Sequence, residues 1–425
     1  MNLYYINKNL HNKYIIYLFL LIPILIIFSK FITEFIIIII NFYIFLNYKK
    51  CLENIKNAKE ENKENLKIFF IFCLFFSYIF LNSIFNTKNI SDSFKSISLI
   101  RFAILILLPI LITKDLNKNL LLFFVTTVLV FNTDLFYQFL SGENILGYKS
   151  NEEYSRYAGF FKNELIAGSY LFFIFFILLL LYNFFNFRKI LLVIVLITYI
   201  GVYISGDRQP FLSLNLGIFI LTTLHFKRTI KYIIQKKIFF LGFFLILLIF
   251  FSQNKINFLT KKYSNVIEYA QKVDIKETNY YYHYSKAYLI FKSHFFFGSG
   301  YKSFRYECSN NTYNDLEKKK LDKRHFDGCA THPHNFYLEL LSELGIVGFL
   351  IFIFLFFNLV KICVTNIRNN CKQKNQYKIL LAFLISYFFP FKPTGSIYTN
   401  FSLIMFFFVI TFFFIIKKNS NIMDK

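Results

Sequence analysis

The sequence contains little proline and glycine, and its histidines and cysteines lack the spacings that mark metal sites. Among its 425 residues there are 6 Pro, 14 Gly and 6 Cys. No CxxC or HxxxH accompanies the cysteines, so we expect no bound metal, and no other cofactor is indicated. The first residues, MNLYYINKNLHNK, are only weakly basic, and no small-residue cleavage site follows the first apolar run. We therefore expect no cleavable signal peptide.

Acidic residues are also scarce, which gives the chain a formal net charge of +24. A nucleic-acid-binding protein gathers its basic residues on one face, and such a face is often interleaved with aromatic residues. Here the lysines lie mostly in short links between apolar runs, as the positive-inside rule describes for membrane proteins. The sequence thus argues against a nucleic-acid partner and for a lipid bilayer.

Apolar residues, in contrast, are abundant: they make up 56% of the chain and include 62 Phe. They form repeated runs of about 20 residues, the length that spans a bilayer as a helix. We therefore predict an all-α integral membrane protein with about twelve transmembrane helices. The expected spans are residues 13–31, 33–48, 67–86, 97–113, 119–139, 165–184, 188–205, 209–225, 237–252, 334–360, 378–393 and 398–416.

The short links between these spans set their orientation. The links rich in Lys and Arg lie at residues 49–67, 227–237 and 361–374, and the C-terminal tail is also basic. All of them fall on one side of the membrane when the expected spans are counted, so both termini should be cytoplasmic. We expect a multi-pass protein of the bacterial inner membrane, with its active site facing the periplasm.

The expected helices divide the chain into three regions. Residues 1–251 hold the first nine helices and an outer loop at 140–164, and residues 334–425 hold the last three. Between them, residues 252–333 form one long outer loop, which is periplasmic by helix parity. Loops of this length are uncommon unless functional, so we expect a large helical periplasmic loop that forms a lid or small domain.

Cys308 and Cys329 are the only two cysteines in the long outer loop. A disulfide between them would close about 20 residues and stabilise the loop by about 3 kcal/mol in the chain-entropy model. The periplasm is a compartment in which such bonds persist. The alternative is a pair of free thiols.

Several charged residues lie at or near the outer ends of the expected spans. Arg101, Arg156 and Arg208 are costly at this depth and are therefore candidates for a functional site. The alternatives are that Arg101 snorkels to the interface, that Arg156 is a solvated loop charge, and that Arg208 pairs with Asp207. Glu164 has a similar choice between substrate binding and capping of the following helix. Guanidinium groups match phosphate oxygens with two parallel hydrogen bonds, so the cluster predicts a lipid pyrophosphate as ligand.

The stretch GCATHPHNFYLELLSELGIVGFL, residues 328–350, opens the tenth expected span with polar residues. Pro333 suits the first turn of a helix, so we expect Thr331 or His332 as its N-cap. On a helix that begins there, one face carries His332, Asn335, Glu339 and Glu343. Such a face must lie against protein or a wet cavity. Gly345 and Gly348 should let this helix pack closely against a neighbour.

The two histidines of this stretch, His332 and His334, are candidates for proton transfer. Histidine is the natural base near neutral pH. The alternative is that the pair caps the helix and contacts lipid headgroups. Zinc is not expected, because the His-x-His spacing splays the two rings and no third ligand is evident.

Four stretches together resemble the O-antigen ligase/polymerase family of bacterial membrane glycosyltransferases. They are HPHNFYLELLSELGIVGF, FGSGYKSFRYEC (297–308), SGDRQPFLSL and GFFKNELIAGSYL (159–171). The resemblance extends over about residues 95–360. It implies a fold of the C-type glycosyltransferase kind. It also implies that a glycan passes from undecaprenyl pyrophosphate to an acceptor at the outer face, without a metal.

The resemblance also implies roles for individual residues. Arg208 matches the arginine that binds the pyrophosphate, and His332 or His334 matches the histidine that acts on the acceptor hydroxyl. Arg305 and His283 fall in loop segments that are similar in some members, and with Asn335 and Glu339 they complete the expected substrate-binding residues. The chain departs from the family in two places: Asp207-Arg208-Gln209 replaces Ser-Arg-Gly, and Lys286 stands where arginine is frequent.

Three functions are compatible with these features. We favour a ligase that moves the glycan onto lipid A-core or another acceptor. A polymerase of the same family would instead extend the lipid-linked glycan, and the sequence does not separate the two. A lipid-glycan flippase or transporter is the non-enzymatic alternative. Against it, the sequence has no two-half repeat and no paired broken helices, and its polar residues gather at one face.

Overall fold

The protein is represented by a computed structural model of the whole chain, and the structure describes most of it. The described residues are 2–56, 60–87, 89–112, 116, 118–150, 156–182, 188–225, 278–310, 328–369 and 371–423. Throughout these ranges the regular structure is helical, apart from one isolated bridge between Glu143 and Lys149. The expectation of an all-α protein is confirmed for this part of the chain.

The helices follow the apolar runs of the sequence. They are α1 (Asn2–Phe28), α2 (Lys30–Leu46), α3 (Tyr48–Lys56), α4 (Glu60–Asn86), α5 (Ile90–Ile97), α6 (Ile100–Ile104), the 3-10 helix η1 (Leu105–Leu107), α7 (Leu108–Leu111), α8 (Lys118–Ser141), the 3-10 helix η2 (Gly159–Phe161), α9 (Ala167–Leu181), α10 (Arg188–Ile204), α11 (Arg208–Leu224), α15 (Asn279–Ser293), α16 (Phe304–Glu307), α17 (Phe336–Arg368), α18 (Lys374–Tyr387) and α19 (Asn400–Met423). Several begin at a residue whose side-chain oxygen accepts from the first turn: Ser29, Asn89, Thr278 and Asn335. Such N-caps satisfy amides that have no partner inside the helix.

Several of these helices have the length and apolarity of membrane spans. Among the described residues, five segments qualify on their own: Lys63–Asn86, Ile90–Leu111, Leu121–Ser141, Phe336–Arg368 and Asn400–Asn419. The bent pair α2 and α3 would make a sixth. Helices also lie at the other expected spans, except 237–252, which falls outside the described residues. The chain is therefore a multi-pass membrane protein, and the count of twelve crossings stays a prediction.

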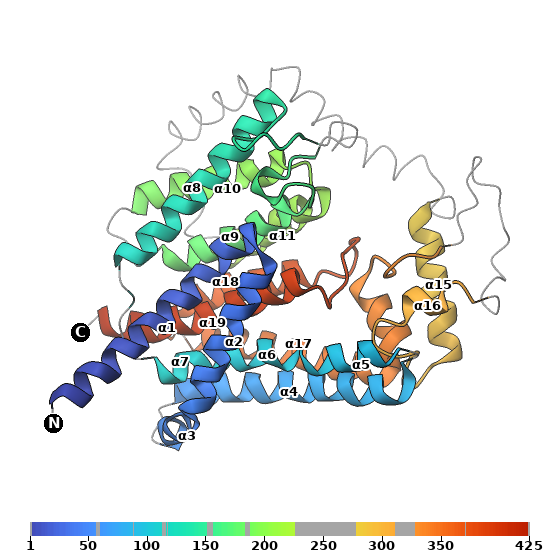
Figure 1. Cartoon of the computed structure of the whole chain (residues 1–425), viewed down its shortest axis with the longest axis horizontal. Coiled ribbons are helices and arrows are strands. Elements are labelled where there is room, and N and C mark those ends of the chain that lie inside the picture. The colour runs from blue at the N-terminus through green and yellow to red at the C-terminus, as the bar shows by residue number, and fades with distance from the viewer. Residues whose placement is uncertain are drawn as a thin grey trace.

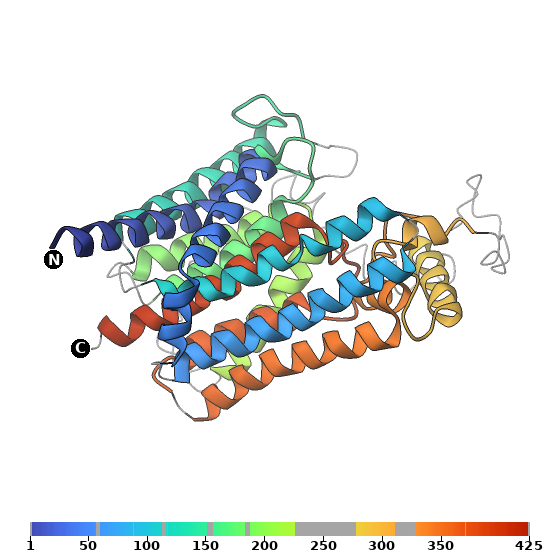
Figure 2. The same cartoon turned by 60° about the horizontal axis from the view of Figure 1, so that its bottom comes forward.

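The helices lie roughly along one direction, so the bundle has two ends (Figures 1 and 2). The start of α1 and the end of α19 lie at one end, which we call the terminal end (Figure 1). Helices α15 and α16 lie at the opposite end, beside the last turns of α4 and the first turns of α17 (Figure 2). We call this the site end, because residues 328–335 lie there.

A polar cluster joins four helices at the terminal end. The carboxylate of Glu64 on α4 accepts from Lys417 Nζ at 2.6 Å, from Tyr377 Oη at 2.7 Å and from Asn366 Nδ2 at 2.9 Å. These partners belong to α19, α18 and α17. Hydrogen bonds between side chains in a weakly polar setting gain strength from one another, so the cluster stabilises the packing of α4 against α17, α18 and α19.

Helix α17 is broken at Gly345, whose backbone has φ 67° and ψ −171°. The break frees carbonyl groups before it and amides after it, and buried backbone groups need partners. Residues 295–300 supply them. Their amides donate to the carbonyls: Ser299 N to Ser342 O at 3.0 Å and Gly300 N to Glu343 O at 2.9 Å. Their carbonyls accept from the amides: Ile346 N to Phe295 O at 2.9 Å and Val347 N to Phe296 O at 3.2 Å.

Two glycines make this exchange sterically feasible. A Cβ on Gly345 would overlap the backbone of Phe296, and a Cβ on Gly298 would overlap the backbone of Glu343. We expected Gly345 and Gly348 only to thin the helix for packing. This is correct for Gly348, which lies against the Tyr78 ring on α4, and wrong for Gly345, where the helix stops.

Replacement of Gly345 by alanine should therefore destabilise the protein by about 3 kcal/mol or more, because it combines a glycine-only backbone conformation with a backbone clash. A thiol-reactive dye that reports exposure of the buried Cys51 and Cys363 on heating measures this in detergent.

Gly395→Ala is the matched control. Gly395 has no positive φ, and a Cβ there would meet nothing within 4 Å. The melting temperature of the Gly395→Ala variant should equal that of the wild type. Equal melting of the two alanine variants would contradict the assignment of Gly345 as an obligatory break.

Candidate functional site

The histidine stretch is an irregular segment that ends at Asn335. His334 has φ 56°, a left-handed conformation that turns the chain just before the helix. Asn335 is the N-cap of α17, and its Oδ1 accepts from Tyr337 N at 3.0 Å and Leu338 N at 3.2 Å. The expected cap at Thr331 or His332 is therefore wrong, because asparagine is a strong N-cap and lies directly at the turn.

This correction changes the expected polar face. His332 precedes the helix, so it does not continue the row of Glu339 and Glu343. Both glutamates are buried and accept backbone hydrogen bonds. Glu343 accepts from Lys302 N at 2.9 Å and Phe304 N at 3.2 Å, and Glu339 accepts from Ile397 N at 2.9 Å. They therefore hold two loops of the site end in place.

Three histidine rings meet at the site end. The centroid of His334 lies 4.3 Å from that of His332 and 4.9 Å from that of His283 on α15. His283 is buried, and its Nδ1 lies 2.8 Å from the carbonyl oxygen of Gly328. His332 Nδ1 lies 3.0 Å from Thr331 Oγ1. The described residues contain no group of His, Cys, Asp or Glu arranged to hold a metal ion.

The surroundings favour neutral rings in this cluster. Burial lowers the pKa of His332 to about 4, with further lowering from His334, His283 and Arg305, while the Thr394 backbone acts in the opposite direction. Burial and the neighbouring His283 also lower the pKa of His334. A neutral imidazole can accept a proton. His332 Nε2 is buried and has no hydrogen-bond partner among the described residues, which is costly unless a ligand supplies one.

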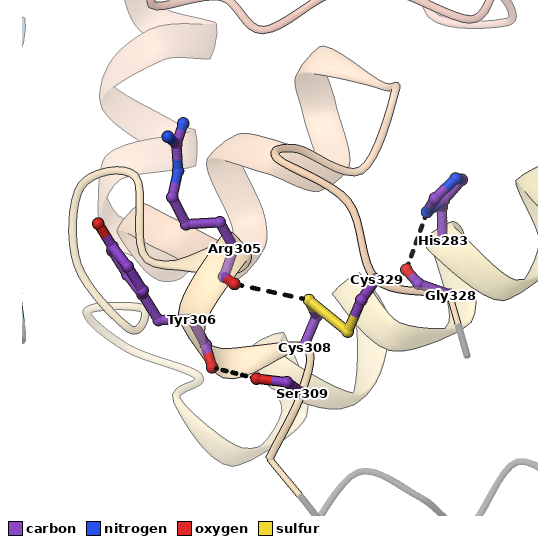
Figure 3. The surroundings of a disulfide bond; sticks show 7 residues. All are labelled: His283, Arg305, Tyr306, Cys308, Ser309, Gly328 and Cys329. Atoms are coloured by element: carbon purple, nitrogen blue, oxygen red, sulfur yellow. Dashed lines mark hydrogen bonds between the residues drawn. A yellow bond between two sulfur atoms is a disulfide. The ribbon is translucent and has the colours of Figure 1, made fainter. Parts of the chain in front are cut away.

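The segment that contains α16 is tied to the histidine stretch by a disulfide between Cys308 and Cys329, with Cα atoms 5.2 Å apart (Figure 3). Cys329 directly follows Gly328, whose carbonyl contacts His283 in the same view. Arg305 lies on α16 and is exposed, and its side chain extends away from the disulfide (Figure 3). The disulfide thus joins α16 to the segment that carries the histidines.

A second group of charged residues lies where α10 turns into α11. Gly206 has φ 72°, and Arg208 is the first residue of α11. The Asp207 carboxylate accepts from Arg156 Nε at 2.7 Å, also from Arg156 Nη2, and from Gly168 N at 3.0 Å. Asp207 therefore pairs with Arg156, and the alternative of an Arg208–Asp207 ion pair is not what the structure has.

Arg208 is in a different state from the other two arginines. It is exposed, and among the described residues it has no hydrogen-bond or ion-pair partner. Arg156 also donates to the Leu165 carbonyl at 2.8 Å, so its guanidinium is engaged by protein. Arg101 donates to Ser98 O at 2.5 Å and lies 3.5 Å from Glu34.

Glu164 lies 2.6 Å from Lys30 at the start of α2, and both side chains are about half exposed. The N-cap position of α9 belongs to Ile166, so the alternative of Glu164 as a cap is wrong. Exposed ion pairs of this kind contribute little to stability.

The loop of residues 388–399 connects the two groups. Its Pro390 carbonyl accepts from Asn335 Nδ2 at 3.0 Å, and its Thr394 amide donates to His334 O at 2.8 Å. On the other side, Lys392 Nζ donates to Ser213 Oγ on α11 at 2.9 Å. We did not identify Lys392 from the sequence. Its only signal is a lysine next to proline in a link, FKPTGSI, that is otherwise poor in charge.

Residues 191–353 match the family model described as O-Antigen ligase. Over this segment the chain is similar to the O-antigen ligase family. The segment contains Arg208, all three clustered histidines, Arg305 and the disulfide, whereas Arg101, Arg156 and Lys392 lie outside it. No curated protein matches the chain. The resemblance of the sequence to the O-antigen ligase family is therefore confirmed over this segment.

The Arg156–Asp207 pair should be energetically coupled, because it joins the loop before α9 to the turn that carries Arg208. A double-mutant cycle with Arg156→Ala and Asp207→Ala should give a coupling of about 1 to 3 kcal/mol, as for charged hydrogen bonds. Unfolding by SDS titration measures it.

The Lys30–Glu164 pair provides the control cycle. Its coupling should stay below about 1 kcal/mol, because both partners are exposed. If the coupling in the Arg156–Asp207 cycle were no larger than in this control, the pair would not stabilise the turn between α10 and α11.

Proposed function

We propose that this protein is a glycosyltransferase that moves a glycan from undecaprenyl pyrophosphate to an acceptor hydroxyl at the periplasmic face of the inner membrane. The acceptor is lipid A-core or another surface molecule. The match of residues 191–353 to the O-antigen ligase family supports this proposal. So does the loop of residues 388–399, which contacts both the histidine segment and α11. Ligases and polymerases of this family act on lipid-linked glycans, which a multi-pass membrane protein can reach.

Arg208 would bind the donor. Its guanidinium is exposed and without a protein partner, and it stands at the N-terminus of α11, where the helix dipole also favours an anion. In the reaction the bond between the anomeric carbon and the pyrophosphate oxygen breaks, and the electron pair leaves with the pyrophosphate. A fixed guanidinium stabilises that growing charge, so the proposal includes no metal.

A histidine would activate the acceptor. The acceptor oxygen forms the new bond to the anomeric carbon while its proton passes to a neutral imidazole. The observation that carries the proposal is the buried His332 Nε2, which has no hydrogen-bond partner of normal geometry among the described residues, in a ring whose Nδ1 lies beside Thr331. We therefore propose that His332 accepts the proton of the acceptor hydroxyl and that His334 has a positioning role. A single displacement of this kind inverts the anomeric configuration.

Within this reaction class the ligase is distinguished from the polymerase by its acceptor. A gel of surface glycan from a deletion strain separates them. Loss of a ligase leaves the acceptor bare while lipid-linked polymer accumulates. Loss of a polymerase leaves single repeats on the acceptor, and that pattern would replace the ligase assignment.

Substitution of the assigned residues in the complemented deletion strain should abolish transfer. Arg208→Ala should lower the rate by about a hundredfold or more, as does removal of a single charge-stabilising donor elsewhere. Arg208→Lys should restore only part of it, because an ammonium cannot form the two parallel hydrogen bonds. His332→Ala should be as defective as Arg208→Ala, and His334→Ala less so.

Arg368→Ala is the control. Arg368 is an exposed arginine in the last turn of α17, at the opposite end of that helix from the histidines. It should transfer at the wild-type level. If Arg208→Ala and the double variant His332→Ala, His334→Ala both kept full transfer, the proposed mechanism would be wrong.

The acid limb of kcat/KM should lie near pH 4, because the pKa of His332 is lowered to about 4 from its ordinary 6.5. The ring stays neutral and able to accept a proton above that limb. The same shift affects stability: as pH falls from 6.5, the unfolded chain is protonated first, so stability is lost progressively down to about pH 4. Initial rates of purified protein with a lipid-linked donor measure the profile. An acid limb near pH 6.5 would mean that the base is a histidine with an ordinary pKa.

A further inference from the structure

Lys392 is a buried lysine at the site end. It lies in the loop between α18 and α19 and is 6% exposed. Its ammonium donates to Ser213 Oγ and to the Ser386 carbonyl, both at 2.9 Å, and lies 5.7 Å from the centre of the Tyr387 ring. An ammonium has three N–H groups, so these two acceptors leave one available.

Among the described residues, no carboxylate forms an ion pair with Lys392. Within the part of the chain that the structure describes, each ion pair within 4.0 Å joins other residues. Burial lowers the pKa of Lys392 to about 7, and no opposing charge restores it. The buried carboxylates of Glu339 and Glu343 on α17 accept from backbone amides. A buried cation whose described partners are only uncharged oxygens is costly, which points to a role beyond folding.

The position of Lys392 supplies that reason. Its acceptor Ser213 lies on α11 five residues after Arg208, about 7.5 Å along the helix. Ser213 Oγ also accepts from Gln209 Nε2 at 3.1 Å, and Gln209 directly follows Arg208. Lys392 thus contacts the first turns of α11, the helix whose first residue is the exposed Arg208. The same loop holds the histidine segment through Pro390 and Thr394.

We propose that Lys392 is a second cation of the donor site, which stabilises the bound pyrophosphate of the lipid donor from beneath Arg208. The proposal rests on the proposed function, because it assumes an anionic donor. Arg208 reaches the anion from the exposed side, and the buried ammonium adds positive charge where little water screens it.

Binding of farnesyl pyrophosphate, a short polyprenyl pyrophosphate, tests this. The detergent-solubilised full chain is titrated, and binding is read from the rise in melting temperature, with farnesol as the uncharged probe. Farnesyl pyrophosphate should stabilise the wild type and farnesol should not. Lys392→Met keeps the length of the side chain without its charge and should weaken the apparent affinity about tenfold, which corresponds to about 1.4 kcal/mol. Lys392→Arg should retain affinity within about threefold.

Lys378→Met is the matched control. Lys378 also links α18 to α11, by donating to the Leu224 carbonyl at 2.7 Å, but at the other end of α11. Its affinity for farnesyl pyrophosphate should equal that of the wild type. Equal affinity of wild type and Lys392→Met overturns the role of Lys392 and leaves the proposed function intact, even if Lys392→Met melts at a lower temperature. If the wild type binds the pyrophosphate no better than farnesol, both the donor assignment and the role of Lys392 fail.

Discussion

The exchange of backbone hydrogen bonds at Gly345 is the constraint on which the site end depends. Residues 295–300 replace the helical partners that α17 loses at its break, and α17 does the same for them. The carboxylate of Glu343 then holds the next turn, at Lys302 and Phe304. The short α16 follows immediately; it carries Arg305, and Cys308 is its C-cap. In this way the segment that contains α16 is anchored to α17, although no continuous secondary structure joins the two.

Charged groups at the site end divide by whether protein satisfies them. The carboxylates of Asp207, Glu339 and Glu343 are buried and fully engaged, and each fixes a turn or loop. Among the described residues, the guanidinium of Arg208 and the Nε2 of His332 are basic or neutral groups that have no protein partner. Such an imbalance suits an anionic donor and a hydroxyl-bearing acceptor. It also explains why Arg156, paired with Asp207, shapes the site without facing it.

Local chemistry in the sequence was enough for part of this account. Apolar runs predicted the helices, and the family motifs identified the domain that the comparison confirmed. The N-cap was misjudged because Pro333 and Asn335 are competing signals two residues from each other, and only the left-handed turn at His334 decides between them. The break at Gly345 was missed because apolar residues continue through it and its partners lie some 45 residues earlier. Pairs such as Arg156–Asp207 and Lys392–Ser213 join distant segments and leave no local pattern.

The loop of residues 388–399 has a consequence for how this protein can evolve. Its contact points alternate along the chain: Pro390 and Thr394 face the histidine segment, Lys392 reaches α11, and Ile397 meets Glu339. A single inserted or deleted residue would put every later contact out of step. Loops usually absorb changes in length, but this one can vary only in side chains such as Phe391, which is 87% exposed. Under the proposed function, adaptation to a different acceptor would therefore involve other parts of the surface.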